Sequence, residues 1–226
     1  AVKNIESNGK GHIDLNEIPI DDAKTYDMLQ RGDTLGVFQL ESSGMTALVR
    51  RLRPDCFEDM IALVALYRPG PLESGMVDTY VKCKHGEEKV HYLHPRLEPY
   101  MKDTYGVILY QEQVMQSARE LAGYTLGEAD LLRRAMGKKK KEVMEKERAK
   151  FVDGAVSNGV DAKQAGDIFD IIEKFAGYGF NKSHSAAYGL IAYWTAWLKA
   201  NYGAEYLASY LSSLIGSKME VLGQYI

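Results

Sequence analysis

Apolar side chains recur along most of this chain at the three- and four-residue spacing of amphipathic helices. Alternating runs of β-branched residues, which would predict strands, are scarce. The pattern predicts one helix that begins near Ala23 and others at 36–52, 56–67, 107–121, 126–134, 138–156, 162–175, 184–201 and 204–214. We therefore expect a mostly α fold with at most one small β-ribbon, for which 89–93 is the candidate strand.

Residues that start and stop helices sharpen this prediction. Asp21 or Asp22 suits the N-cap of the first helix, and Asp161 and Ser183 suit the N-caps of two later ones. The string Arg-Pro-Gly-Pro at 68–71 cannot continue a helix, because proline lacks the backbone donor and glycine favours other conformations. It predicts a rigid, exposed corner.

Composition places the chain among ordinary globular proteins. It has 226 residues, of which 46% are hydrophobic and 26% charged, and its formal net charge is −3. Cys56 and Cys83 lie far apart and show no zinc-finger spacing with the histidines, so we expect no disulfide framework, no zinc site and a cytoplasmic location. No stretch approaches the ~20 consecutive apolar residues of a membrane span, so we expect no membrane contact.

Positive charge is concentrated in one segment. Nine Lys or Arg residues and three Glu residues lie between 131 and 150. On a helix, Arg134, Lys138 and Lys141 would share one face, which suits a row of phosphates. The same segment also fits a solvated surface helix whose Glu side chains pair with the cations. Gly137 predicts a kink or an end within this helical stretch.

Two arginines differ from the other cations of this segment. Arg133 and Arg134 lie in an otherwise apolar run from 131 to 136. Because a guanidinium beside a core is seldom left unpaired, each must pair with a carboxylate or face an anionic ligand. The sequence leaves both possibilities open.

A second polar constellation is Tyr-Gly-Phe-Asn-Lys-Ser-His-Ser at 178–185. Glycine permits a tight turn, the aromatic rings offer stacking faces, and Lys182 adds positive charge. Because the segment leads into a helix N-terminus, whose N–H groups attract anions, a nucleotide or a nucleic-acid strand fits this chemistry. An ordinary capped helix, with Phe180 as its hydrophobic staple and His184 in its first turn, fits equally well.

Catalytic signatures are missing from the sequence. Tyr110 begins a helical segment rich in amides, where a hydrogen-bonded core tyrosine is the commoner explanation. No P-loop, Gly-x-Ser-x-Gly or His-Glu-x-x-His motif occurs, and no pair of aspartates lies in an apolar strand. We expect no catalytic residue and no metal site in this chain.

Five motifs resemble those of bacterial DNA polymerase III alpha subunits and occur in the same order. They lie at 54–63, 67–72, 110–113, 132–139 and 177–188. The similarity extends from about residue 18 to at least 207 and is to the form common in Gram-negative bacteria. It implies a multi-helix module from the polymerase fingers. On this resemblance, 1–20 would be a linker from the palm, 21–214 the fingers region and 215–226 the start of the next segment.

The resemblance also implies roles for single residues. Arg133 and Arg134 match positions that face the phosphates of the incoming deoxynucleoside triphosphate (dNTP). Tyr110 also matches a position that faces the dNTP, and His184 matches one near its sugar. The expected DNA or phosphate contacts are Lys138, Lys139, Lys140 and Lys182.

The activity that the resemblance implies is DNA-directed DNA synthesis by a two-metal polymerase. The family's catalytic aspartates belong to the palm, and neither its Asp-x-Asp nor its Lys-Phe-Asp-Phe string occurs here. We therefore expect Mg²⁺ to belong to the full-length enzyme and this chain alone to be inactive. The expected partners are primer-template DNA, dNTPs and, through the full-length protein, the other replicase subunits.

Two other classes of function fit the residues. One is a stand-alone helical nucleic-acid-binding module, which intact palm motifs upstream in the parent gene would exclude. The other is a protein-interaction scaffold whose basic segment meets an acidic partner. DNA binding that weakens steeply with salt would argue against the scaffold.

Overall fold

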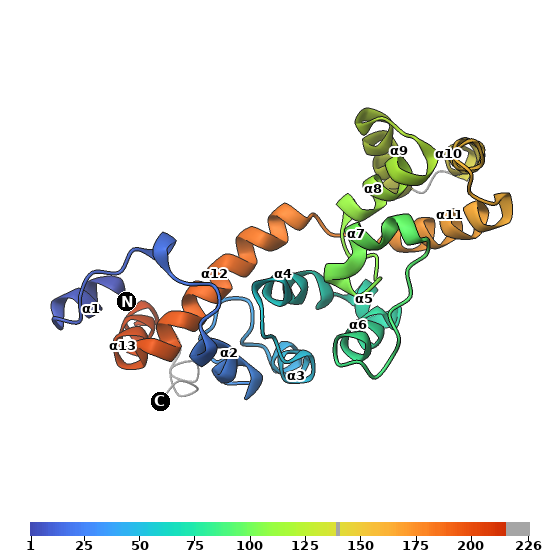
Figure 1. The fold of residues 1–226 in the computed structure, drawn as a ribbon. Helices are drawn as coiled ribbons and strands as arrows, with labels where there is room; N and C mark the ends of the chain where they lie inside the picture. Colours follow the sequence, from blue (N-terminus) through green and yellow to red (C-terminus); the bar gives the residue numbers. More distant parts are fainter. Residues whose placement is uncertain (139–140, 216–226) are drawn as a thin grey trace. The chain divides into compact units, whose positions relative to one another are not determined.

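The computed structural model describes residues 1–138 and 141–215. Its chain divides into two compact units: the first combines residues 1–67 with those from 185 onward, and the second contains residues 68–184. Both units are built from helices, and the described residues form no strand, so the predicted mostly α class is confirmed (Figure 1). Among these residues, no helix has the length and apolar character that a membrane crossing needs.

The first unit packs around the long helix α12. Its elements are α1 (Val2–Ser7), a 3-10 turn (Leu15–Glu17), α2 (Ala23–Gln30), α3 (Ser43–Leu52), α4 (Phe57–Leu66), most of α12 (Lys182–Asn201) and α13 (Gly203–Ser213). Tyr193 of α12 is fully buried, and its ring lies 5.5 Å from that of Tyr26 and 6.2 Å from that of Phe57. The Tyr193 hydroxyl donates to the Pro19 carbonyl at 2.8 Å. One aromatic side chain thus joins α12 to α2 and α4.

The second unit has its own core. Its elements are α5 (Pro69–Glu73), α6 (Met76–Lys84), a 3-10 turn (Pro95–Leu97), α7 (Glu98–Met101), a second 3-10 turn (Lys102–Thr104), α8 (Gln111–Ala122), α9 (Leu126–Lys138), α10 (Lys141–Ser157) and α11 (Ala162–Ala176). Phe151 and Phe169 are fully buried with their ring centroids 5.4 Å apart, and Leu121 and Leu132 belong to the same cluster. Helices α8 to α11 therefore share one hydrophobic core.

Two predicted helix starts are confirmed by their caps. The Asp22 carboxylate accepts a hydrogen bond from Thr25 N at 3.0 Å, and the Asp161 carboxylate accepts one from Gln164 N at 3.0 Å. Each bond satisfies an N–H group that the first helical turn leaves without a partner.

The predicted helices at 36–52 and 107–121 both begin later than expected. Ser42 caps α3 by accepting from Met45 N at 3.3 Å, and Gln39 has a left-handed φ of 65°. That backbone conformation is incompatible with a helix continuing through 36–42. Helix α8 begins at Gln111, because the preceding residues are extended and bond to a distant loop.

Two other local predictions were wrong, and one helix was missed. The corner at 68–71 is the start of α5, since proline is well suited to a first helical turn, and Pro71 is buried. Helix α6 was not predicted, whereas the candidate strand at 89–93 does not form. Gly137 is the next-to-last residue of α9, which ends at Lys138 beside residues outside the described part of the chain, so the kink or end predicted there stays a prediction.

Gly154 marks a close approach between α10 and α8. A Cβ atom at this position would lie 2.3 Å from the Ala122 carbonyl oxygen, whereas one at Gly137 would meet nothing within 4 Å. We expect Gly154→Ala to lower the free energy of unfolding by about 1–2 kcal/mol, because overpacking outweighs the gain in helix propensity. The matched Gly137→Ala should raise it by about 0.5–1 kcal/mol. Urea denaturation of both variants checks this, and a stabilised Gly154→Ala protein would contradict the close approach.

Candidate functional site

Two of the motifs found in the sequence meet in the second unit. Phe180 N donates to Leu109 O at 3.0 Å, and Gln111 N donates to Phe180 O at 2.9 Å. These bonds form an isolated parallel bridge between Tyr110 and Phe180. The Tyr110 motif and the loop before α12 are therefore fixed to each other through the backbone.

Gln113 holds the strand-like segment in front of α8. It is only 5% exposed, and its Oε1 accepts from Leu109 N and Tyr110 N, both at 2.8 Å. Its Nε2 donates to Thr104 Oγ1 at 2.6 Å and to Tyr100 O at 3.2 Å. The Gln113 side chain therefore provides hydrogen-bond partners for four polar groups of this region.

The side chain of Glu112, a residue of α8, lies at the N-terminus of α12. Its Oε2 accepts from Lys182 N at 3.0 Å, and its Oε1 accepts from Asn181 Nδ2 at 3.1 Å. Asn181 Oδ1 in turn accepts from His184 N at 2.8 Å, so Asn181, not the predicted Ser183, caps this helix. An external anion at this helix end was one of the two interpretations that the sequence left open, and the end already holds a carboxylate of the protein.

The arginine pair shares one acidic partner. Arg133 donates through Nε and Nη2 to Asp130 Oδ1 at 3.0 and 2.8 Å, and Arg134 Nε lies 2.9 Å from Asp130 Oδ2. The Arg133 hydrogen bond and the two positive charges lower the pKa of the Asp130 carboxyl. The Arg133 side chain is 29% exposed and that of Arg134 is 64% exposed. Both arginines are therefore paired, with one positive charge in excess.

Gln111 connects this pair to the loop. Its Oε1 accepts from Arg133 Nη1 at 3.2 Å, and its Nε2 donates to Gly179 O at 3.2 Å. The Gln111 side chain therefore links Arg133 to the loop that forms the Tyr110–Phe180 bridge.

Arg68 contacts the loop that precedes α12. Its guanidinium lies 4.2 Å from the centroid of the Phe180 ring and donates from Nη2 to Tyr178 O at 2.7 Å. Burial lowers the pKa of Arg68. A Cβ atom at Gly70 would lie 2.2 Å from the Tyr178 ring, so this glycine makes room for the aromatic side chain. The 68–71 string is thus part of the site's framework.

The other predicted site residues lie around the same bridge. Tyr110 is 3% exposed, with the Lys182 ammonium 5.4 Å from its ring centroid, and both line a hollow of about 220 Å³. The exposed His184 packs edge-on against Phe180, with the ring centroids 5.4 Å apart. Lys139, Lys140 and the side chain of Lys138 fall outside the described residues.

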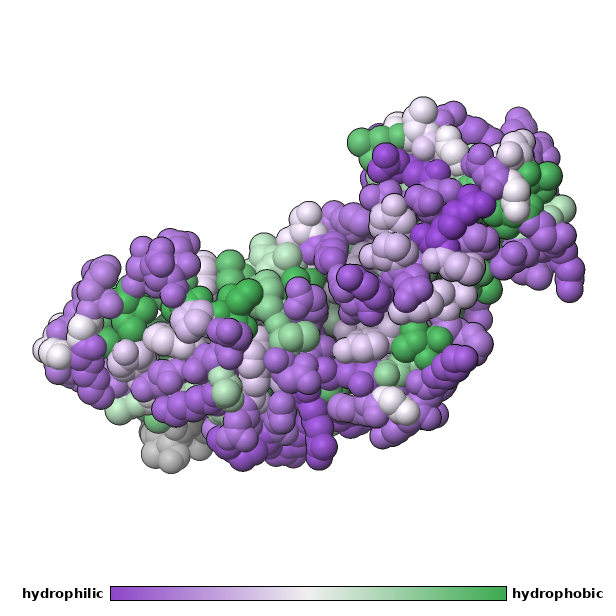
Figure 2. Space-filling model, in the orientation of Figure 1, coloured by the Kyte–Doolittle hydropathy of each residue, from purple (hydrophilic) through white to green (hydrophobic). Residues whose placement is uncertain are grey.

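Sequence reasoning missed four residues of this framework: Arg68, Gln111, Glu112 and Asp130. A signal for Asp130 was available, because it precedes the two arginines by three and four residues on a predicted helix. The other three act through contacts with residues distant in the sequence. Over α8 to α10, the face drawn in Figure 2 is mostly hydrophilic with scattered apolar areas.

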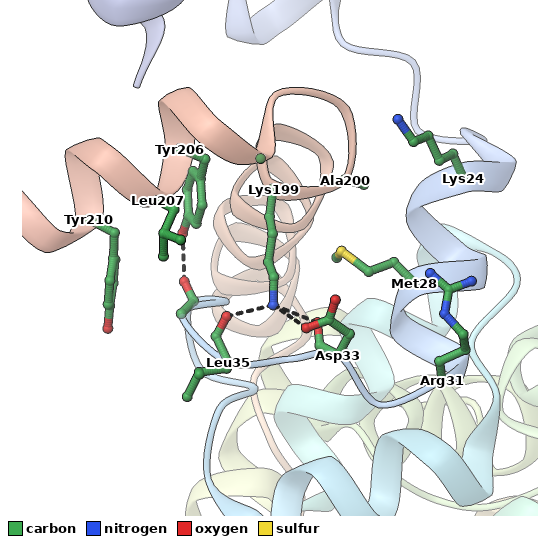
Figure 3. A pocket seen from close by; sticks show the side chains of 12 residues that line it. Lys24, Met28, Arg31, Asp33, Leu35, Lys199, Ala200, Tyr206, Leu207 and Tyr210 are labelled. Carbon is green, nitrogen blue, oxygen red and sulfur yellow. Dashed lines mark hydrogen bonds and ion pairs between the residues drawn. The ribbon is translucent and has the colours of Figure 1, made fainter. Parts of the chain in front are cut away.

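A separate hollow of about 450 Å³ lies in the first unit between α2, α12 and α13 (Figure 3). Its lining is largely apolar and contains none of the predicted site residues. Lys199 points into it, but the ammonium is paired with the Asp33 carboxylate and donates to Leu35 O at 2.8 Å. Its charge is therefore neutralised within the protein.

One group of acidic and sulfur ligand atoms also lies in the first unit. Asp55, Cys56 and Asp59 place such atoms within 4.8 Å of one another. Asp59 accepts from Asp55 N at 3.0 Å and is buried, so this contact at the start of α4 gives the group a structural role.

Comparison with known proteins identifies the family of this chain. Residues 1–159 match the bacterial DNA polymerase III alpha subunit finger domain. The chain is 58% identical over 221 residues to the DNA polymerase III subunit alpha of Escherichia coli, which covers 96% of this chain and 19% of that protein. The corresponding protein of Haemophilus influenzae is 56% identical over 222 residues, and that of Pseudomonas aeruginosa is 59% identical over 206 residues.

These comparisons place the chain in the class of polymerase fingers modules. This chain belongs to the family of bacterial DNA polymerase III alpha subunit finger domains. It spans about a fifth of the length of the relatives named above, in each case 18–19%.

Proposed function

We propose that this chain binds the incoming dNTP and neighbouring DNA phosphates in a bacterial replicative DNA polymerase. Arg133 and Arg134 would hold the triphosphate, with Tyr110 and His184 beside the nucleoside. Lys182 and the lysines at 138–140 would contact phosphates of the DNA. Family membership favours this function over a stand-alone nucleic-acid-binding module or an interaction scaffold.

The observation that carries the proposal is the placement of Arg133. Among the described residues, its bonds to Asp130 and Gln111 use three of the five N–H groups of a guanidinium. The remaining N–H groups suit phosphate oxygens, which arginine binds in a fork geometry. Because these bonds already fix the Arg133 side chain, it would lose less conformational entropy on binding a ligand than a mobile arginine would.

The side chains proposed to bind the nucleotide and DNA are mainly donors, whereas Mg²⁺ needs oxygen ligands. The two carboxylates of the site, Asp130 and Glu112, are already paired with Arg133 and with the N-terminus of α12. We therefore propose that Mg²⁺ and the catalytic aspartates belong to the rest of the polymerase and that this chain alone extends no primer. The other replicase subunits would bind the full-length protein, which would act in the cytoplasm.

The DNA contact predicts a change in salt dependence. In the full-length polymerase, replacing Lys138, Lys139 and Lys140 by Gln should flatten the fall of log K for primer-template with log salt. The expected change in this slope is roughly 0.7 to 0.9 for each phosphate that the lysines no longer neutralise. Fluorescence anisotropy at several salt concentrations measures it. Replacing Lys146, Lys150 and Lys163 by Gln removes the same charge and serves as the control; equal slopes for both variants would contradict the contact.

The position of His184 predicts a role in sugar selection. The ring lies against Phe180 at the start of a capped helix, so it projects from a rigid element. In the full-length polymerase, we expect His184→Ala to raise the ratio of kcat/KM for ribonucleotides to that for dNTPs. If both values fall together and the ratio stays the same, His184 contacts the phosphates instead.

A further inference from the structure

We infer that Gln111 is a positioning residue, which aligns Arg133 with the loop that precedes α12. The inference rests on the proposed contact between Arg133 and the nucleotide. Under this inference, the Gln111 amide connects Arg133, which would bind the phosphates of the nucleotide, to the loop beside His184, which would lie near the sugar.

The carboxamide of Gln111 reaches in two directions. Its Oε1 accepts from Arg133 Nη1 and its Nε2 donates to Gly179 O, both at 3.2 Å. Because a guanidinium can only donate and a carbonyl can only accept, these partners fix the orientation of the amide. Neither glutamate nor an apolar side chain can make both bonds.

Asp130 cannot replace this link. It precedes Arg133 by three residues on α9, so it orients the guanidinium only relative to its own helix. Gln111 instead ties α9 to the Gly179–Phe180 backbone, which its own N–H also binds at 2.9 Å. Phe180 in turn contacts His184 and Arg68. Removal of the Gln111 amide would leave Arg133 paired with Asp130 but abolish the two hydrogen bonds that join its guanidinium to the loop.

The test is a double-mutant cycle in the full-length polymerase. Gln111→Met preserves side-chain length but makes neither hydrogen bond. We expect it to raise the KM for dNTP about tenfold, while kcat and the Kd for primer-template change less than about twofold. In an Arg133→Ala background, the same substitution should have no further effect on that KM. Gln164→Met, which removes an exposed amide that donates to Leu93 O, is the matched control.

The outcomes separate the two proposals. If Arg133→Ala leaves the KM for dNTP unchanged, the nucleotide contact itself is wrong. If Arg133→Ala raises the KM but Gln111→Met does not, or raises it equally in both backgrounds, the positioning role of Gln111 is overturned and the arginine contact stands. Should Gln111→Met fail to fold, Gln111→Asn provides the second variant. It keeps an uncharged amide but is one methylene shorter, so it cannot reach both partners and should also raise the KM; an unchanged KM would again overturn the role.

Discussion

Replacing Arg133 by alanine in the full-length polymerase is expected to lower kcat/KM for every dNTP by about 10²-fold. A charge-assisted hydrogen bond contributes about 1.5–3 kcal/mol, which corresponds to roughly 10- to 150-fold in rate or affinity. The Kd for primer-template should change less than about threefold, because the proposed ligand of Arg133 is the triphosphate. Steady-state kinetics in which dNTP and primer-template are varied separately measure both quantities.

Arg148 offers a matched control for this experiment. Like Arg133, it is paired with an aspartate in the second unit, donating to Asp170 at 2.7 and 3.1 Å. We expect Arg148→Ala to leave nucleotide kinetics unchanged. Arg133→Lys should rescue little, because lysine lacks the planar fork. A defect of Arg133→Ala that is confined to primer-template affinity would instead place this arginine along the DNA.

The second large effect concerns stability. Gln113→Leu should destabilise the region around α8 by about 3–5 kcal/mol, because it leaves several buried polar groups without their partner. Native-state hydrogen exchange of the α8 amides measures the local free energy of unfolding. A denaturation curve would instead report an average over the two units of the chain.

Gln116→Leu is the control on the same helix. Gln116 is half-buried and accepts a hydrogen bond from Arg119 Nη1 at 3.1 Å. We expect this substitution to change the exchange free energy by less than about 0.5 kcal/mol. Equal protection in the two variants would show that the four bonds of Gln113 contribute little.

Local chemistry was readable from the sequence, and long-range pairing was not. Asp22 and Asp161 were predictable caps because their partners lie three residues away. At 107–110, apolar residues continue the helical spacing, yet the backbone is extended because Leu109 and Gln111 bond to Phe180, some 70 residues on. No periodicity reports such a pairing.

The candidate site divides in the same way. The motifs that carry Tyr110, Arg133, Arg134, Lys182 and His184 were identified from residue chemistry and family resemblance, and their roles remain predictions. The shared aspartate at 130 was visible in the helical spacing of charges. The link through Gln111 depends on a tertiary contact, which only the structure provides.

The Glu112 carboxylate at the N-terminus of α12 has an electrostatic consequence for any nucleotide that approaches. A helix N-terminus carries about half a positive charge, and a full negative charge from Glu112 more than offsets it. The helix end and this carboxylate together carry about half a negative charge, so the backbone N–H groups would not attract a polyphosphate. If the chain binds a nucleotide as proposed, side-chain cations alone would attract its phosphates, and the guanidinium groups would direct its charged tail away from the aromatic loop.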